Sequence, residues 1–121
     1  MPEPGARLAP FKTGMPSPLD PQNILPLRGE IDLNVSPEIA STFKEIIRDK
    51  PPRVVVDLTD VTYIDSSGLA MLIVGMQQVK EYGGKFALAG LQNDVRSILE
   101  TARLDQLFVT YPHIDEALAA E

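Results

Sequence analysis

The sequence has no cysteine, no tryptophan and a single histidine among its 121 residues. Without cysteine there can be no disulfide bond, thiolate nucleophile, iron–sulfur cluster or zinc site with sulfur ligands. The one histidine, His113, leaves at most one imidazole for any catalytic triad or metal cluster. We therefore expect neither a metal ion nor a cofactor.

Positive charge is also in short supply, because 11 Lys and Arg residues face 17 Asp and Glu residues, for a net charge of −6. A nucleic-acid-binding protein needs a basic face, so this balance argues against that class. The N-terminus lacks a basic segment followed by an apolar run, so we expect no secretory signal. The longest strongly apolar run, Leu69 to Met76, is far shorter than the roughly 20 residues that span a bilayer. These features predict a cytoplasmic protein that binds no membrane.

Proline is concentrated at one end of the chain, with seven of the 11 prolines in residues 1–26. Proline removes a backbone donor and fixes φ, which disfavours regular helices and interior strands. We therefore predict a proline-rich, flexible N-terminal arm over 1–22 and a folded domain over 23–121. A docking peptide, or an irregular edge strand around 9–12, is the alternative for the arm.

From residue 23 onward, short runs rich in β-branched residues alternate with longer segments of helical periodicity. The pattern predicts strands over 23–28, 53–58, 86–89 and 107–111, and helices over 37–50, 67–81, 93–102 and 114–120. Ser36 and Asn93 are expected to cap two of these helices. Such alternation indicates an α/β domain with a mixed, mostly parallel sheet of four to five strands and about four helices.

Two other features offer weak candidates for chemistry. Gly83-Gly84-Lys85 is not a phosphate-binding loop, because Val79 and Phe86 stand where that motif requires glycine and Ser or Thr. We expect it to end a helix. The pair Glu30 and Asp32 follows the first strand, where a solvated loop or a cap is the simpler reading than a catalytic carboxylate pair. With no complete nucleophile–base pair, we do not expect an enzyme.

The most informative segment is Asp65-Ser66-Ser67-Gly68-Leu69, which lies between the 62–64 run and a strongly helical stretch. Ligands and partners of α/β sheets usually bind at the carboxyl ends of the strands. Asp and Ser are good helix caps, so this segment has a purely structural interpretation. The alternative is that an exposed serine hydroxyl beside the small Gly68 is a site of modification.

The helix that follows this segment carries more apolar residues than one core-facing stripe needs. Deep burial is one explanation. The other is a contact patch, in which Met71, Val74 and Gln78 form one partly exposed face beside Ser66.

The segment from Ile24 to about Ala120 resembles the STAS domains, and among them the bacterial anti-sigma factor antagonists. Four motifs carry the resemblance: Gly29-Glu30-Ile31-Asp32, Val54-Val55-Val56-Asp57-Leu58, Tyr63-Ile64-Asp65-Ser66-Ser67-Gly68-Leu69 and Gly83-Gly84-Lys85.

The resemblance implies a STAS-like fold and a regulatory switch. Ser66 would be phosphorylated by an anti-sigma factor that is also a serine kinase, and a metal-dependent serine phosphatase would reset it. Glu30 and Asp32 would lie near the same partner surface. Together with the contact patch, the expected partner-binding residues are Glu30, Asp32, Asp65, Ser66, Ser67, Gly68, Met71, Val74 and Gln78. The alternative is a STAS-type scaffold or transport-accessory subunit without a phosphoswitch.

Overall fold

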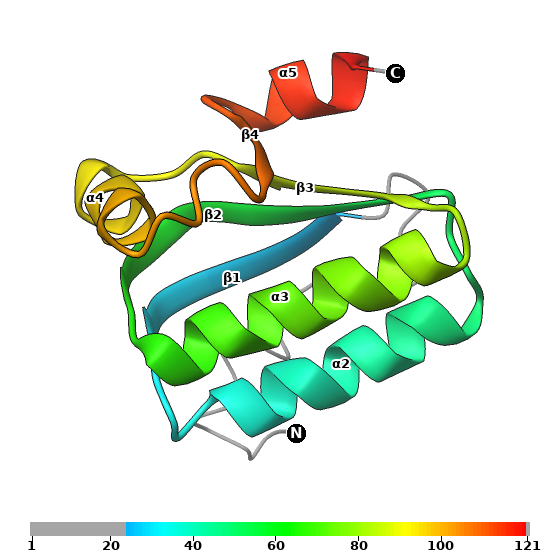
Figure 1. Ribbon diagram of the computed structural model, residues 1–121, viewed down its shortest axis with the longest axis horizontal. Helices are drawn as coiled ribbons and strands as arrows, with labels where there is room; N and C mark the ends of the chain where they lie inside the picture. The colour runs from blue at the N-terminus through cyan, green and yellow to red at the C-terminus, as the bar shows by residue number, and fades with distance from the viewer. Residues whose placement is uncertain (1–23, 121) are drawn as a thin grey trace, which may run out of the picture.

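A computed structural model describes residues 24–120 of the chain as four strands alternating with four helices (Figure 1). In chain order the elements are β1 (Ile24–Ile31), α2 (Ser36–Arg48), β2 (Arg53–Ile64), α3 (Ser66–Glu81), β3 (Lys85–Ala89), α4 (Asn93–Thr101), β4 (Val109–Tyr111) and α5 (Ile114–Ala119). The predicted α/β class is confirmed. The predicted arm over 1–22 and its edge strand lie outside the described residues.

The four described strands form one parallel sheet in the order β1-β2-β3-β4. Each pair of neighbours is joined by a helical crossover, as parallel pairing requires. All crossovers therefore run in one direction along the sheet, and the carboxyl ends of β1 and β2 finish side by side. The cross-strand pair Ile31↔Ile64 marks that end.

Strands β1 and β2 are both longer than the sequence pattern predicted. β1 continues past Arg28 to Ile31, so Glu30 belongs to the strand and only Asp32 follows it. The register shifts on either side of Arg28 and Gly29, and Gly29 has a φ of +77°. These irregularities interrupt the alternation of side chains between the two faces of the sheet, but β1 stays paired with β2. β2 accordingly runs on to Ile64, because β1 pairs with it along that whole length.

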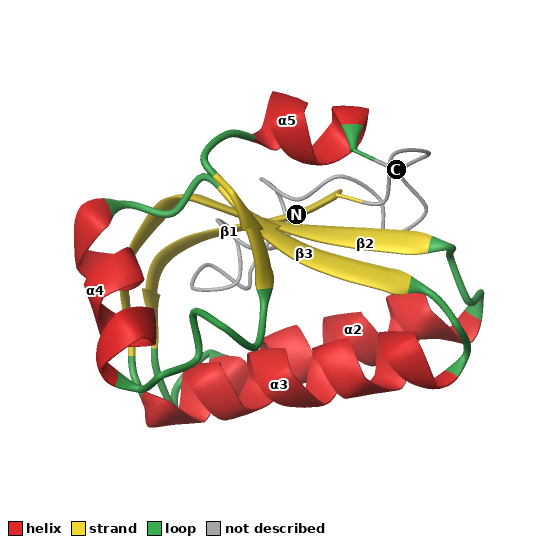
Figure 2. Cartoon of the chain, turned by 45° about the horizontal axis from the view of Figure 1, so that its top comes forward, coloured by secondary structure: helices red, strands yellow, loops and turns green. Residues whose placement is uncertain are grey.

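Helices α2 and α3 lie side by side over one face of the sheet, and α5 lies over the other (Figures 1 and 2). Between the sheet and the α2–α3 layer lies the main core, which also takes in Val95 and Leu99 of α4. A smaller cluster of Val55, Ala89 and Ala117 lies beneath α5. Within residues 24–120, no helix is both long and apolar enough to cross a membrane.

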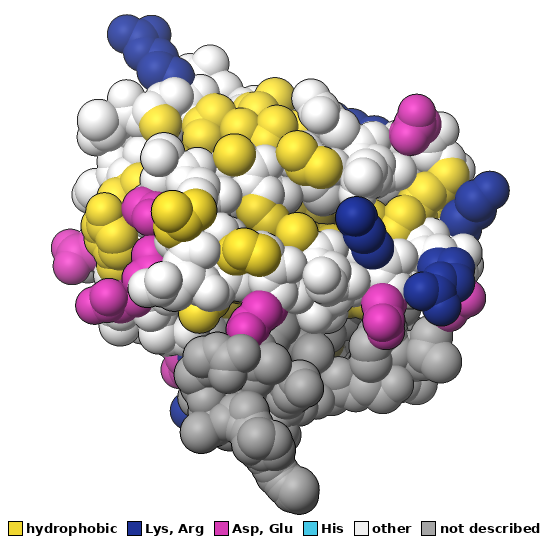
Figure 3. Space-filling model, turned by 90° about the horizontal axis from the view of Figure 1, so that it is seen from below, with side chains coloured by type: hydrophobic (Ala, Val, Ile, Leu, Met, Phe, Trp, Pro, Cys, Tyr) yellow, Lys and Arg dark blue, Asp and Glu magenta, His cyan; other side chains and the backbone are white. Residues whose placement is uncertain are grey.

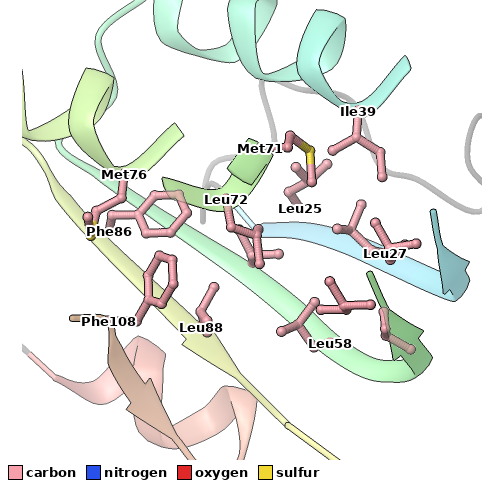
Figure 4. Close-up of a cluster of buried hydrophobic side chains, with 14 of the residues drawn as sticks. Leu25, Leu27, Ile39, Leu58, Met71, Leu72, Met76, Phe86, Leu88 and Phe108 are labelled. Carbon is pink, nitrogen blue, oxygen red and sulfur yellow. The ribbon is translucent and has the colours of Figure 1, made fainter. Parts of the chain in front are cut away.

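The core is a continuous set of aliphatic side chains with three phenylalanines, of which Phe86 and Phe108 are seen in Figure 4. Phe86 of β3 lies between Phe43 of α2 and Phe108, with ring centroids 6.0 and 6.1 Å away. The β2 segment Val54-Val55-Val56 is fully buried, as its β-branched run predicted for an inner parallel strand. This rigid centre fixes where the carboxyl ends of β1 and β2 meet the first turn of α3.

Candidate functional site

The Asp65–Leu69 segment turns the chain from the end of β2 into α3. The Asp65 N–H donates to the carbonyl of Ile31 at 3.0 Å, which ties the turn to the end of β1. Asp65 is the N-cap, with an extended backbone at φ −96° and ψ −174°. Its Oδ1 accepts the N–H groups of Ser67 at 2.9 Å and Gly68 at 3.1 Å. The capping interpretation of this segment is therefore confirmed for Asp65.

The carboxylate of Asp65 also accepts the Ser67 hydroxyl at 2.6 Å. This hydrogen bond is the main cause that lowers the pKa of Asp65 below its usual value. The hydrogen bond from the Gly68 N–H lowers the pKa further, whereas burial raises it by a smaller amount. Hydrogen bonds to the charged form favour ionisation, so Asp65 stays a carboxylate at neutral pH.

The two adjacent serines have different environments. Ser67 is half-buried, donates to Asp65 and accepts a hydrogen bond from the Ser36 hydroxyl at 3.2 Å. Ser36 is only 6 % exposed. Ser66 is exposed at the first position of α3, and its hydroxyl has no hydrogen-bond partner among residues 24–120. Of the two hydroxyls, only that of Ser66 is open to a second protein.

The role that the sequence suggested for Ser36 is wrong. Ser36 is the first residue of α2 rather than its cap, and Val35 occupies the capping position without a side-chain bond. The backbone carbonyl of Asp32 accepts the N–H groups of Val35 and Ser36, which leaves the Ser36 hydroxyl free to reach Ser67. Asn93 likewise is the first residue of α4 rather than its cap. The capping position is occupied by Gln92, whose backbone is extended and whose side-chain Nε2 donates a hydrogen bond to the Thr59 carbonyl.

The acidic residues of the first strand reach the same end of the molecule. Glu30 is exposed and pairs across the sheet with Tyr63, two residues before Asp65. Asp32 is half-buried, and its Oδ1 accepts the Asn34 N–H at 2.9 Å in the turn before α2. Glu30, Asp32 and Asp65 thus lie at the end of the sheet where α3 begins.

Gly68 serves the core rather than a partner. It is buried, and a Cβ built there would lie 2.8 Å from the Cγ2 of Ile64 and 2.9 Å from the Cγ2 of Ile31. Gly68 was expected among the partner-binding residues, but its missing side chain makes room for Ile31 and Ile64. Glycine is needed here because the first turn of α3 sits directly on the ends of β1 and β2.

The predicted exposed face of α3 is confirmed at two of its three positions. Val74 is 49 % exposed, and Gln78 is half-buried. Met71 is only 8 % exposed, so its expected exposure is wrong. The reason is the neighbouring helix, because Met71 turns toward α2 and joins the main core.

Several exposed or groove-lining residues near this site were not predicted. Leu33, in the turn between β1 and α2, is 71 % exposed, and Tyr63 is 47 % exposed. A groove of about 300 Å³ between α2 and α3 joins Val74 and Ser67 to Pro37 and Ala40 of α2. The spacing of Pro37, Ala40 and Lys44 on one face of α2 was the available signal for this second wall.

The other candidates do not contribute to this site. His113, exposed, precedes α5 on the opposite face of the sheet from α3 (Figure 2). Gly83 has a φ of +89° in the turn that ends α3, as expected for a helix stop. In the described part of the chain, no group of three His, Asp or Glu side chains is placed to hold a metal ion.

Comparison with known proteins supplies the family. The STAS domain model matches residues 18–117. A STAS-domain-containing protein of Pseudomonas aeruginosa is 30 % identical over 96 residues, which are 79 % of this chain and 94 % of that protein. The anti-sigma-F factor antagonist RsfB of Mycobacterium tuberculosis is 26 % identical over 95 residues, covering 78 % of this chain and 77 % of RsfB.

Solved structures share the fold. An anti-sigma factor antagonist from Mycobacterium paratuberculosis superposes with a TM-score of 0.72 at 28 % identity, covering 78 % of this chain and 80 % of its own. A sulfate transporter family protein from Wolinella succinogenes has the same fold, with a TM-score of 0.71, 20 % identity and coverage of 91 % and 92 %. With its family model, its relatives and its fold in agreement, this chain belongs to the STAS domain family.

Proposed function

We propose that this protein is an anti-sigma factor antagonist. In its unphosphorylated form it binds an anti-sigma factor that is also a serine kinase, and so frees the sigma factor. Phosphorylation of Ser66 releases the partner, and a metal-dependent serine phosphatase restores the binding form. The observation that carries this proposal is the exposed hydroxyl of Ser66, which has no hydrogen-bond partner within residues 24–120, beside the hydroxyl of Ser67, which is held in two hydrogen bonds.

The phosphoryl transfer uses groups from both proteins. The Ser66 Oγ attacks the γ-phosphorus of ATP, the bond from that phosphorus to the ADP oxygen breaks, and the hydroxyl proton passes to a base of the kinase. We assign the base to the kinase because no hydrogen bond within residues 24–120 joins Asp65 to the Ser66 hydroxyl, and the Oδ1 of Asp65 already accepts three donors of the turn. This chain acts as the substrate and the binding partner, not as the enzyme.

A phosphate on Ser66 is compatible with the fold. It sits at the N-terminus of the 16-residue helix α3, where the helix dipole favours negative charge. The fold therefore stays intact, and the phosphate acts on partner binding.

Binding is a different matter, because the phosphate adds a charge of roughly −1.5 to −2 beside Asp65, Glu30 and Asp32. A partner that packs against this end would have to desolvate that charge. A coupling of about 1–3 kcal/mol corresponds to roughly a 5- to 150-fold loss of affinity, which is enough to release the partner.

The proposed partner surface combines an acidic rim, which consists of Glu30, Asp32 and Asp65, with exposed apolar side chains. From the rim it takes Glu30, Asp32 and Asp65, and from α3 it takes Ser66, Ser67, Val74 and Gln78. Leu33 and Tyr63 add two exposed apolar side chains next to the rim. Gly68 and Met71, both buried, lie beneath this surface.

The test starts from a Ser66→Ala variant, which is expected to bind the kinase but to accept no phosphate. The immobilised variant captures proteins from a lysate of the source cells, and the captured serine kinase is then purified. That kinase and ATP are incubated with the wild-type chain, Ser66→Ala and Ser67→Ala, and the phosphate is located by mass spectrometry of peptides.

We expect one phosphate per chain on Ser66 in the wild type and in Ser67→Ala. Phosphate on Ser67 alone, or no phosphate on any variant, would contradict the proposal. Capture of a permease or of a multi-subunit scaffold, with Ser66 unmodified, would instead indicate the scaffold or transport-accessory role.

A further inference from the structure

The groove between α2 and α3 is apolar near Ser66. Phe43 and Met71 form its floor, and Ala40 and Val74 stand on its two sides. Gly75 also lines the groove, and a Cβ there would lie 3.3 Å from the Phe43 ring. The groove thus presents apolar surface on a face that the fold itself does not cover.

A second hollow, of about 510 Å³, continues the groove along the same two helices. The two hollows share Lys44 and Gln78 as lining residues, so they adjoin along the helix pair, and we call the two together the channel. It runs from Ser36 at the start of α2 to Lys50 just beyond its end. The 13 residues of α2 span about 20 Å at 1.5 Å per residue, which sets the length of the channel.

The far half of the channel is basic. It is lined by Lys44, Arg48 and Lys50 against one acidic residue, Glu81. Lys44 and Arg48 form no ion pair within residues 24–120. In Figure 3, which views the α2–α3 face, hydrophobic side chains occupy the middle and acidic side chains gather at the left edge, while Lys and Arg lie mainly toward the right, with further acidic side chains between them. The chain as a whole has a net charge of −6, so the positive charge of this half of the channel is opposite in sign to that of the whole chain.

We propose that this channel binds an amphipathic helix of the anti-sigma factor kinase, in one orientation. The apolar stripe of that helix packs on Ala40 and Val74, its basic end meets the acidic rim around Ser66, and its acidic end meets Lys44 and Arg48. The inference rests on the proposed function. It adds the form of the partner's docking element and the residues that set its direction.

A helix suits this channel better than an extended strand. Straight grooves between two helices accept the i, i+3, i+4 and i+7 side chains of an amphipathic helix. A strand would leave its backbone N–H and C=O groups without partners, because both walls are helices whose own backbone groups are already paired. The channel length of about 20 Å corresponds to roughly four helical turns.

Charge reversal at Lys44 tests the orientation, with Lys80→Glu as the matched control. Lys80 is exposed on α3 but lines neither half of the channel, so Lys80→Glu changes the net charge by the same amount. The kinase purified in the phosphorylation experiment is titrated calorimetrically with wild type, Lys44→Glu and Lys80→Glu. We expect Lys44→Glu to bind about 10-fold more weakly and Lys80→Glu to bind within about twofold of wild type.

A kinetic measurement accompanies the titration. Because Lys44 lies away from Ser66, Lys44→Glu should raise the KM for phosphorylation of Ser66 and leave kcat unchanged. Val74→Asp, at the apolar half, should also weaken binding.

The outcomes separate the two proposals. If the wild type is neither bound nor phosphorylated by the kinase, the proposed function fails. If the wild type is bound and phosphorylated on Ser66 but Lys44→Glu behaves like Lys80→Glu, the proposed function stands and the channel inference is overturned. If Val74→Asp changes the sedimentation mass of the protein alone, the channel holds a second copy of this chain, which also overturns it.

Discussion

Replacing Gly68 by alanine should destabilise the protein, although alanine is the better helix former. The new Cβ would lie 2.8 and 2.9 Å from methyl groups of Ile64 and Ile31, and 3.1 Å from the Ile31 carbonyl. Both isoleucines are 2 % exposed, and the methyls branch directly from their Cβ atoms, so neither can move aside without shifting its strand. Overpacking of this kind costs about 1–3 kcal/mol, against a helix-propensity gain of at most about 1 kcal/mol.

Because the contacts with the methyl groups are below 3.0 Å, the cost should lie at about 2–3 kcal/mol. The net loss should then be about 1–2 kcal/mol, or a fall in Tm of about 5–15 °C for a domain of this size. Gly75→Ala in the same helix is the matched control. The three atoms nearest to its Cβ would all belong to the Phe43 ring, the closest at 3.3 Å, so the propensity gain should offset the contact to within about 0.5 kcal/mol. Both values are measured by thermal and urea unfolding followed by circular dichroism. A Gly68→Ala variant that melts at or above the wild-type temperature would refute the packing argument.

Three further predictions concern the turn and the far side of the sheet. Ser67→Ala should lower the free energy of unfolding by about 1 kcal/mol, because it removes the hydroxyl that links Ser36 to Asp65. Ser66→Ala should change the free energy of unfolding by less than about 0.5 kcal/mol. Equal urea midpoints for the two variants would contradict this. Since the folded-state pKa of Asp65 is lowered, its carboxylate stabilises the fold above the unfolded pKa of about 3.9, and that contribution is lost as the pH falls through the folded pKa. The difference in urea midpoint between wild type and Asp65→Asn should therefore shrink below about pH 4, and a constant difference down to about pH 2 would argue against it. Arg53→Met should speed amide hydrogen exchange in α5 but not in α3, because the Nη1 of Arg53 donates to three carbonyls at the end of α5. Unchanged exchange in α5 would show that those hydrogen bonds do not stabilise the helix.

The sequence predicted the fold well because local signals and the sheet agree. The β-branched run at residues 54–56 and the glycines after α3 mark a buried strand and a helix end without reference to the rest of the chain. The length of β1 could not be predicted in this way. Its extension to Ile31 depends on pairing with β2 across the bulges near Gly29, which is a tertiary interaction.

The site shows the same division. Asp65 was identifiable as a cap because the bonds it accepts come from the two residues that follow Ser66. The Ser36–Ser67 hydrogen bond joins residues 31 positions apart, so no local pattern reveals it. The burial of Met71 likewise depends on how closely α2 packs against α3. Sequence periodicity gives the faces of one helix but not which neighbour covers them.

The most direct test of the account is the affinity of the kinase for the chain before and after stoichiometric phosphorylation of Ser66. Both forms are titrated calorimetrically against the same kinase preparation, and circular dichroism verifies that both are folded. We predict that the phosphorylated form binds at least about 10-fold more weakly while its unfolding temperature stays near that of the unmodified form. Equal affinities of the two folded forms would contradict the proposal that phosphate on Ser66 switches the partner off.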